Sequence, residues 1–198
     1  MNDAADAIRA GKPVILPTDT VYGLCSSAYS GVATQKLYEL KGRDQRQPSA
    51  LIAADMEMLF ECLPELRGRA GVIARALLPG PYTLILPNPA RRYRWLTGDN
   101  PHTIGVRVPH LPEAADRILS LIGCVVATSA NLPGGREPRR VEEIPPEILA
   151  GVAAVVDAGE LPGTPSTIID FTGAEPRVVR EGAGSAAEAI DRVSAALA

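Results

Sequence analysis

Hydrophobic positions along this chain follow two alternating spacings. Apolar residues three and four positions apart, bounded by glycine, proline or charged residues, predict helices over 3–10, 32–40, 71–78, 112–122 and 185–197. Short apolar or alternating runs predict strands over 14–16, 49–54, 82–86, 104–108, 124–128, 152–157, 167–170 and 178–180. The last helix opens with Ser185-x-x-Glu188, the spacing of a capping box. We expect 132–146, rich in proline, glycine and charge, to be an exposed loop.

The order of these elements favours an α/β fold with a mixed sheet. Strands and helices alternate, yet the connection between the strands at 152–157 and 167–170 is too short for a parallel crossover. We therefore expect a twisted sheet with both parallel and antiparallel pairs and flanking helices. A length of 198 residues and a hydrophobic content of 46% suit a single domain over 1–198 with a sizeable core.

Charge and cysteine content narrow the class of protein. The formal net charge of -3 gives no bulk attraction for nucleic acid. Three cysteines, Cys25, Cys62 and Cys124, lie far apart without a C-x-x-C spacing, which is typical of reduced thiols in a cytosolic protein. No apolar run approaches the roughly 18 residues of a membrane span, and the N-terminus lacks a signal-peptide core. We expect a cytoplasmic protein without membrane contact.

Several common catalytic and nucleotide-binding signatures are missing. The sequence has no G-x-x-x-x-G-K-[ST] motif and only a fragment of G-x-G-x-x-G at 182–184. His102 and His110 lack metal-ligand spacing with cysteines or carboxylates, so we expect neither a protein-held metal nor a Ser-His-Asp triad. If the protein binds ATP, scattered arginines, lysines and hydroxyls must hold it.

Two polar segments at element ends are candidate binding groups. Thr18, Asp19 and Thr20 follow the strand at 14–16, where they either face a ligand or form a turn that satisfies backbone N–H groups. Lys41 and Arg43 end the helix at 32–40, where they either hold an anion or complement the helix dipole. The residue pattern leaves both alternatives open.

Further candidates lie on or after later strands. Arg107 stands among apolar strand neighbours, and because an unpaired buried guanidinium is very costly, it needs an anion, either internal or a ligand. Ser129-Ala130-Asn131 follows a strand and either forms a simple turn or holds phosphate. Arg180 ends the last strand, as a phosphate contact or an exposed rim residue.

Four blocks together resemble a known family. Pro-Thr-Asp-Thr-Val-Tyr-Gly-Leu at 17–24, Lys41-x-Arg43, Ser129-Ala130-Asn131 and Ser-Thr-Ile-Ile-Asp at 166–170 occur in the same order as in the YrdC-like threonylcarbamoyl-AMP synthases. The resemblance spans nearly the whole chain and implies a twisted mixed sheet with a large open groove. It also implies a threonine site made by Thr20, Arg107 and Ser166. The nucleotide contacts that it implies are Lys41, Arg43, Gln47, Thr103, Ser129, Asn131 and Arg180.

The resemblance implies a specific reaction. L-threonine and bicarbonate would give N-carboxythreonine, whose carbamate oxygen attacks the α-phosphate of ATP and releases pyrophosphate. Mg²⁺ would accompany ATP, and no side-chain nucleophile is needed, so none is assigned. The product, threonylcarbamoyl-AMP, would pass to a transferase that modifies the adenosine beside the anticodon of certain tRNAs. Because longer members carry a further C-terminal domain, we expect the short, single-domain form.

Departures from the family pattern keep a second hypothesis open. Gln47 replaces a common Asn, Ser49-Ala50 replaces Leu-Ile, Ile52 replaces a frequent His, and 133–137 replaces a hydroxyl-rich stretch. The alternative is a nucleotide- or RNA-binding module of the same fold without adenylation. Arg-Arg-Tyr-Arg-Trp at 91–95 could bind tRNA or double-stranded RNA by charge and stacking, or form a loop whose Trp anchors in the core.

Overall fold

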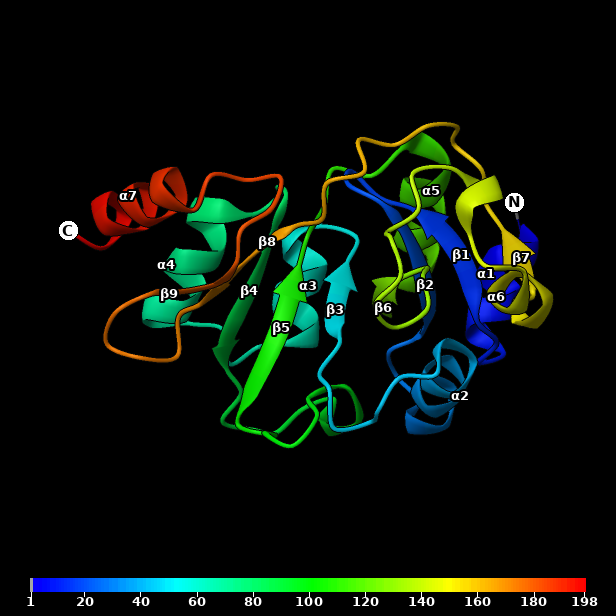
Figure 1. Ribbon diagram of the computed structural model, residues 1–198. Helices are drawn as coiled ribbons and strands as arrows, with labels where there is room; N and C mark the ends of the chain where they lie inside the picture. Colours follow the sequence, from blue (N-terminus) through cyan, green and yellow to red (C-terminus); the bar gives the residue numbers. More distant parts are fainter. Residues whose placement is uncertain (1) are drawn as a thin grey trace.

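The computed structural model describes residues 2–198, which form a nine-stranded sheet flanked by helices, with α1 and α7 at opposite ends (Figure 1). The strands lie in the order β7-β1-β2-β6-β3-β5-β4-β8-β9. Their bounds are β1 (Val14–Pro17), β2 (Tyr22–Ser27), β3 (Ala50–Ala53), β4 (Tyr82–Pro87), β5 (Thr103–Arg107), β6 (Cys124–Ser129), β7 (Ala154–Val155), β8 (Thr167–Asp170) and β9 (Arg177–Arg180). The helices are α1 (Asn2–Arg9), α2 (Gly31–Lys41), α3 (Met56–Cys62), α4 (Gly68–Leu77), α5 (Glu113–Ile122), α6 (Pro146–Gly151) and α7 (Ala186–Leu197), with 3-10 turns η1 (Arg94–Leu96) and η2 (Val141–Glu143).

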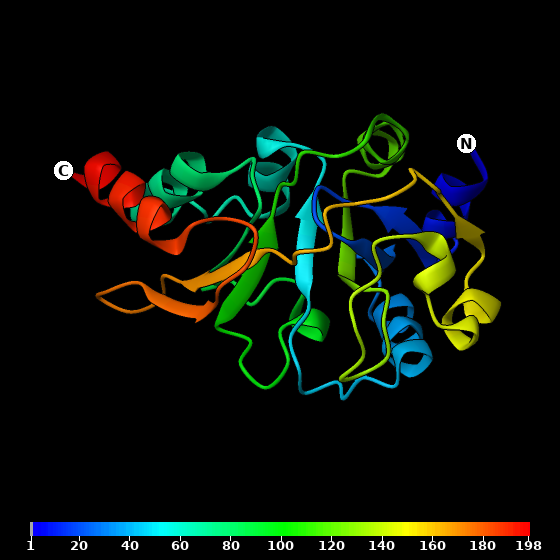
Figure 2. The same cartoon turned by 45° about the horizontal axis from the view of Figure 1, so that its top comes forward.

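The sheet mixes parallel and antiparallel pairs, which confirms the expected fold class. β1 pairs in parallel with β7, β3 with β5, and β4 with β8. The remaining neighbours are antiparallel. The segment between β7 and β8 carries the chain from one edge of the sheet to its other half, as both views show (Figures 1 and 2). Residues distant in sequence are thereby brought to one side of the central strands.

Most expected elements are present, and the exceptions have local reasons. β2 was not expected because its sequence, YGLCSS, is rich in small and polar residues, although all six positions are buried. α3 was also missed, although Asp55 caps it by accepting a hydrogen bond from the Met58 N–H at 2.7 Å. The strand expected over 152–157 is shorter, because only Ala154–Val155 pairs with β1. The loop expected over 132–146 contains η2, and α6 starts at its last residue.

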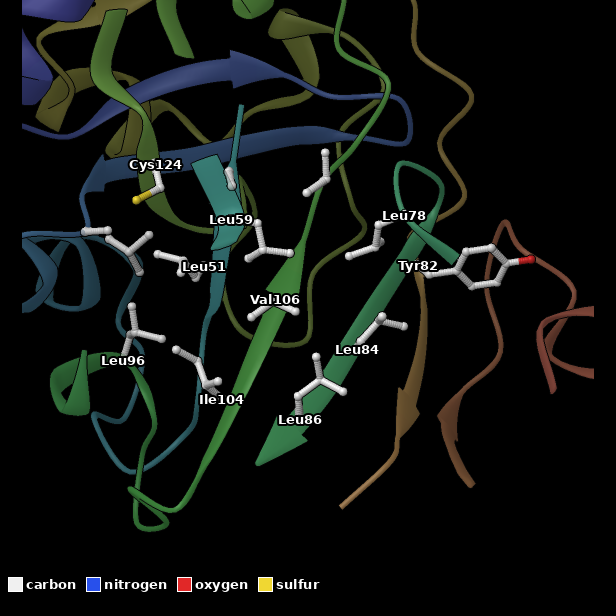
Figure 3. Close-up of a cluster of buried hydrophobic side chains, with 14 of the residues drawn as sticks. Leu51, Leu59, Leu78, Tyr82, Leu84, Leu86, Leu96, Ile104, Val106 and Cys124 are labelled. Carbon is white, nitrogen blue, oxygen red and sulfur yellow. The ribbon is translucent and has the colours of Figure 1, made fainter. Parts of the chain in front are cut away.

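Alternate residues of the central strands enter two separate clusters of buried side chains. Leu51, Leu84 and Val106 belong to the larger cluster, together with Leu59 of α3 and Leu96 of η1 (Figure 3). Side chains of α4 join the same cluster. Ile52 and Ala127 belong to the smaller cluster, together with side chains from α1 and α5. Successive strand residues point to opposite faces, so the two clusters lie on opposite sides of the sheet.

The face that carries the smaller cluster is covered only in part by α1 and α5. These helices contact β1, β2, β6 and β7. Further along the same face, Ile52, Ile85 and Gly105 line a cavity instead. The partial cover therefore leaves the central strands open to a ligand.

The structure also bears on the cysteines and on the question of a membrane-spanning helix. The three cysteines are buried free thiols. No helix within residues 2–198 combines the length and the apolar character needed to cross a membrane.

Candidate functional site

The cavity on the open sheet face has a volume of about 260 Å³. Its floor is apolar and small, because Ile52, Ile85, Gly105 and Ala127 occupy the outward positions of β3, β4, β5 and β6. Polar side chains surround this floor: Arg43, Thr83, Thr103, Arg107, Ser129, Glu137, Ser166 and Arg180. The arrangement suits a ligand with a flat apolar part and several negative charges.

The structure brings together most, though not all, of the residues expected from sequence. The cavity lining contains Arg43, Thr103, Arg107, Ser129, Ser166 and Arg180. The residues expected at the site but not contributing to this lining are Thr20, Lys41, Gln47 and Asn131. For all ten residues, inside or outside the lining, a contact with the ligand stays a prediction.

Thr18 and Thr20 form the polar turn that was one of the two sequence alternatives. The Thr18 hydroxyl donates to the Val21 carbonyl at 2.8 Å and accepts from the N–H groups of Thr20 and Val21 at 3.2 Å. Thr20 is fully buried, and its hydroxyl accepts from Arg107 Nη2 at 2.8 Å. Thr18, rather than Thr20, lines the cavity.

Arg107 has the internal anion that its burial requires. Its side chain is 7% exposed, and Nη2 forms an ion pair with Asp19, which is 13% exposed. Burial lowers the pKa of the guanidinium, and the carboxylate of Asp19 opposes that change. The Nε atom has no hydrogen-bond partner within residues 2–198, although the residue lines the cavity. Arg107 is therefore held by Asp19 in the turn after β1, and its guanidinium has donors that the contacts with Asp19 and Thr20 do not use.

Lys41 connects the end of α2 to the turn after β6. Its ammonium donates to the carbonyls of Ser129 and Asn131 and to Asn131 Oδ1, the last two at 2.8 Å. All three N–H bonds thus have acceptors. Burial, followed by the charge of Arg43, lowers the pKa of Lys41 to about 8. This contact positions Ser129 at the cavity wall.

Arg43 reaches the cavity from the loop that follows α2. Gly42 ends the helix with a positive φ of 66°, and the chain then turns toward β3. Arg43 Nη2 donates to the Pro48 carbonyl at 2.6 Å, while Nε has no partner within the described residues. Gln47, in the same loop, is exposed.

The opposite wall joins β4, β8 and β9. The hydroxyls of Thr83 and Ser166 lie 2.9 Å apart. Arg180 donates through Nη2 to the Ser166 carbonyl at 2.8 Å, and its Nη1 lies 3.7 Å from Glu137 Oε1. Sequence reasoning missed Thr83 and Glu137. Thr83 precedes the core residue Leu84 in an alternating strand, a signal that could have found it, whereas Glu137 lies in a loop without local periodicity.

The aromatic and basic segment at 91–95 lies apart from the cavity lining. The Trp95 indole N–H donates to the Ala28 carbonyl at 2.9 Å, and the residue remains 37% exposed. Its ring also packs beside Gly31 at the start of α2. Trp95 therefore holds the loop against the start of α2 at the surface, not in the core as the alternative had it, and binding of RNA to the segment stays a prediction.

The amino-acid sequence is similar to a known protein family and to individual members of it. A family model named for Sua5, YciO and YrdC, and described as telomere recombination, matches residues 6–182. A threonylcarbamoyl-AMP synthase from Pyrococcus abyssi is 34% identical over 192 residues, which are 96% of this chain and 56% of that protein. A putative threonylcarbamoyl-AMP synthase from Mycobacterium tuberculosis H37Rv is 33% identical over 90% of this chain and 82% of its own length. The chain thus spans little more than half of the first relative.

Solved structures share the fold. P. abyssi Sua5 complexed with L-threonine matches with a TM-score of 0.86 and 34% identity, over 96% of this chain and 56% of that one. Escherichia coli YciO matches with a TM-score of 0.81 and 28% identity, over 96% of this chain and 91% of that one. The expected family resemblance is confirmed by both kinds of comparison.

Proposed function

This chain belongs to the Sua5/YciO/YrdC family, and from that premise we propose that it forms threonylcarbamoyl-AMP and pyrophosphate from L-threonine, bicarbonate and ATP. The threonine amine adds to bicarbonate with loss of water and gives N-carboxythreonine. A carbamate oxygen then attacks the α-phosphorus, and the bond to pyrophosphate breaks. The protein would act as a nucleotidyltransferase.

One observation supports this proposal above the others: three guanidinium groups, of Arg43, Arg107 and Arg180, line one cavity on the open sheet face. Both substrates are anions at the moment of reaction, so a site for them must offset their mutual repulsion. Arginine suits this task because its planar fork binds carboxylate and phosphate through two hydrogen bonds. The likeness to a Sua5 structure that contains L-threonine supports the same proposal.

The described residues suit catalysis by positioning. The reaction needs no protein nucleophile, because the carbamate oxygen itself attacks phosphorus. Arg43 and Arg180 approach from opposite walls and would hold the phosphates, and Arg107 would bind the threonine carboxylate. Ile52 and Ile85 give the floor of the cavity no side-chain hydrogen-bonding group, so the polar contacts to the substrates would come from its walls.

Mg²⁺ would enter with ATP as part of the substrate. When bound, it would neutralise charge on the phosphates. Residues 2–198 contain no cluster of three or more His, Cys, Asp or Glu side chains that could hold a metal ion by themselves. The one carboxylate in the described cavity lining, Glu137, has an unpartnered oxygen that fits this ion.

The wider setting of the reaction follows from its product. Threonylcarbamoyl-AMP is a reactive anhydride, so a transferase that modifies tRNA would use it directly. A cytoplasmic location is part of the same proposal. The names of the relatives favour the synthase over a binding module without adenylation.

Pyrophosphate release by the purified chain tests the proposal. We expect release only when ATP, bicarbonate and L-threonine are all present, with threonylcarbamoyl-AMP detected by mass spectrometry. Arg43→Ala removes a charged contact and should raise the KM for ATP about ten- to a hundredfold. Arg46→Ala is the matched control, because Arg46 is 74% exposed and pairs with Asp44, and it should change KM by less than about twofold. Release that does not depend on threonine would contradict the proposal.

A further inference from the structure

Glu137 is an acidic residue at a site otherwise built for anions. It lies in the segment after β6 and is the one carboxylate among the described residues that line the cavity. Its side chain is 21% exposed. One carboxylate oxygen, Oε1, lies 3.7 Å from Arg180 Nη1, whereas Oε2 is buried without a hydrogen-bond partner within residues 2–198.

The neighbouring arginines do not account for this carboxylate. Arg107 already has Asp19 as its counter-ion, and Arg180 donates through Nε and Nη2 to the Ser166 carbonyl. The distance from Arg180 to Glu137 exceeds that of a charge-assisted hydrogen bond, which is about 2.7–2.9 Å. A buried acceptor without a donor is unfavourable, so Oε2 is suited to a partner that the ligand brings.

A triphosphate alone cannot be that partner. It carries several negative charges, and the carboxylate of Glu137 would repel it. The charge of Glu137 reaches the neighbouring cations: burial lowers the pKa of both Lys41 and Arg107, and the Glu137 carboxylate opposes that change in each. Binding of the nucleotide beside Glu137 therefore favours a form of ATP in which a cation lies between phosphate and carboxylate.

We propose that Glu137 is a ligand of the divalent cation that accompanies ATP, an inference that rests on the proposed function. Mg²⁺ prefers hard oxygen ligands and is commonly held by one or two carboxylates together with substrate phosphates and water. Glu137 Oε2 supplies one such oxygen. Arg180 lies 3.7 Å from the other oxygen, so the carboxylate also stands beside a cation that would bind phosphate. Glu137 thus makes the site select metal-bound ATP over free ATP.

Binding measurements on the whole chain test this selection without catalysis. ATP is titrated into the protein by calorimetry, without threonine or bicarbonate, once with excess Mg²⁺ and once with EDTA. The wild-type protein should bind MgATP more tightly. In Glu137→Gln, metal-free ATP should bind more tightly than in wild type, and the preference for MgATP should fall about tenfold.

A matched control separates the metal contact from a general change of charge. Glu142→Gln makes the same charge change at an exposed residue of η2 that does not line the cavity, and it should keep the wild-type preference. Thermal unfolding confirms that both variants are folded.

Each remaining outcome overturns the inference in a recognisable way. Equal tightening of both ATP forms in Glu137→Gln would make Glu137 a mere counter-charge. Weaker binding of threonine alone would assign the carboxylate to the threonine ammonium. Failure of the wild-type protein to bind either ATP form would overturn the proposed function as well, whereas an unchanged MgATP preference would overturn only the role of Glu137.

Discussion

The ion pair between Asp19 and Arg107 offers the sharpest test of how this site is built. Their side chains are 13% and 7% exposed, so both charges lie largely out of water. Asp19→Asn keeps the shape and removes the negative charge. Removing one partner of a buried pair usually destabilises a protein by about 3–5 kcal/mol. Because the Asn oxygen can still accept from Arg107 Nη2, we expect the lower end, about 3 kcal/mol.

Urea unfolding followed by circular dichroism measures this change. For a chain of this size the loss corresponds to a fall of about 6–12 °C in Tm. The double variant Asp19→Asn/Arg107→Met leaves no stranded charge, so it should be more stable than the sum of the single changes predicts, by about 2 kcal/mol. Asp6→Asn is the surface control. Asp6 pairs with Arg9, their side chains are 66% and 52% exposed respectively, and the change should alter the free energy of unfolding by less than about 1 kcal/mol.

Two results would refute the reasoning. Asp19→Asn with stability within about 0.5 kcal/mol of wild type would show that water or another group already screens the pair. Strict additivity in the double variant would show that Arg107 does not depend on Asp19.

Three further changes test the site. With valine in place of threonine, pyrophosphate should be released at least about tenfold more slowly, since valine has no hydroxyl to hydrogen-bond to Ser166; equal rates would contradict a hydroxyl-reading pocket. In the folded protein the pKa of Lys41 is lowered to about 8, so between pH 8 and about 10.5 the folded state binds fewer protons than the unfolded state. The free energy of unfolding of the wild-type protein should therefore rise over this pH range relative to that of Lys41→Met, which urea unfolding at several pH values would measure. A Cβ on Gly105 would lie 3.7 Å from its nearest atom, so Gly105→Ala should fold normally. The added methyl group would enter the cavity and should weaken ATP binding measured by calorimetry, whereas an unchanged affinity would remove Gly105 from the site.

Local sequence determined most of the secondary structure. Helices such as α5 and α7 were predictable because apolar spacing and capping act within a few residues, as when Ser185 accepts from the Glu188 N–H at 3.3 Å. β2 was not predictable, because pairing with β1 and β6, rather than its own side chains, makes it a strand. The short β7 likewise extends only as far as its pairing with β1.

The sequence also marked the chemistry of the site, since a mid-strand Arg107 requires an anion wherever it lies. Only the tertiary structure decided which anion this is, because Asp19 comes from β1's end and Arg107 from β5. It decided equally that Lys41 holds the turn at Asn131, and that Glu137 lies 3.7 Å from Arg180 at the cavity wall. Periodicity and capping depend on neighbours in the chain, whereas these contacts depend on the order in which the strands pair, and no local pattern encodes that order.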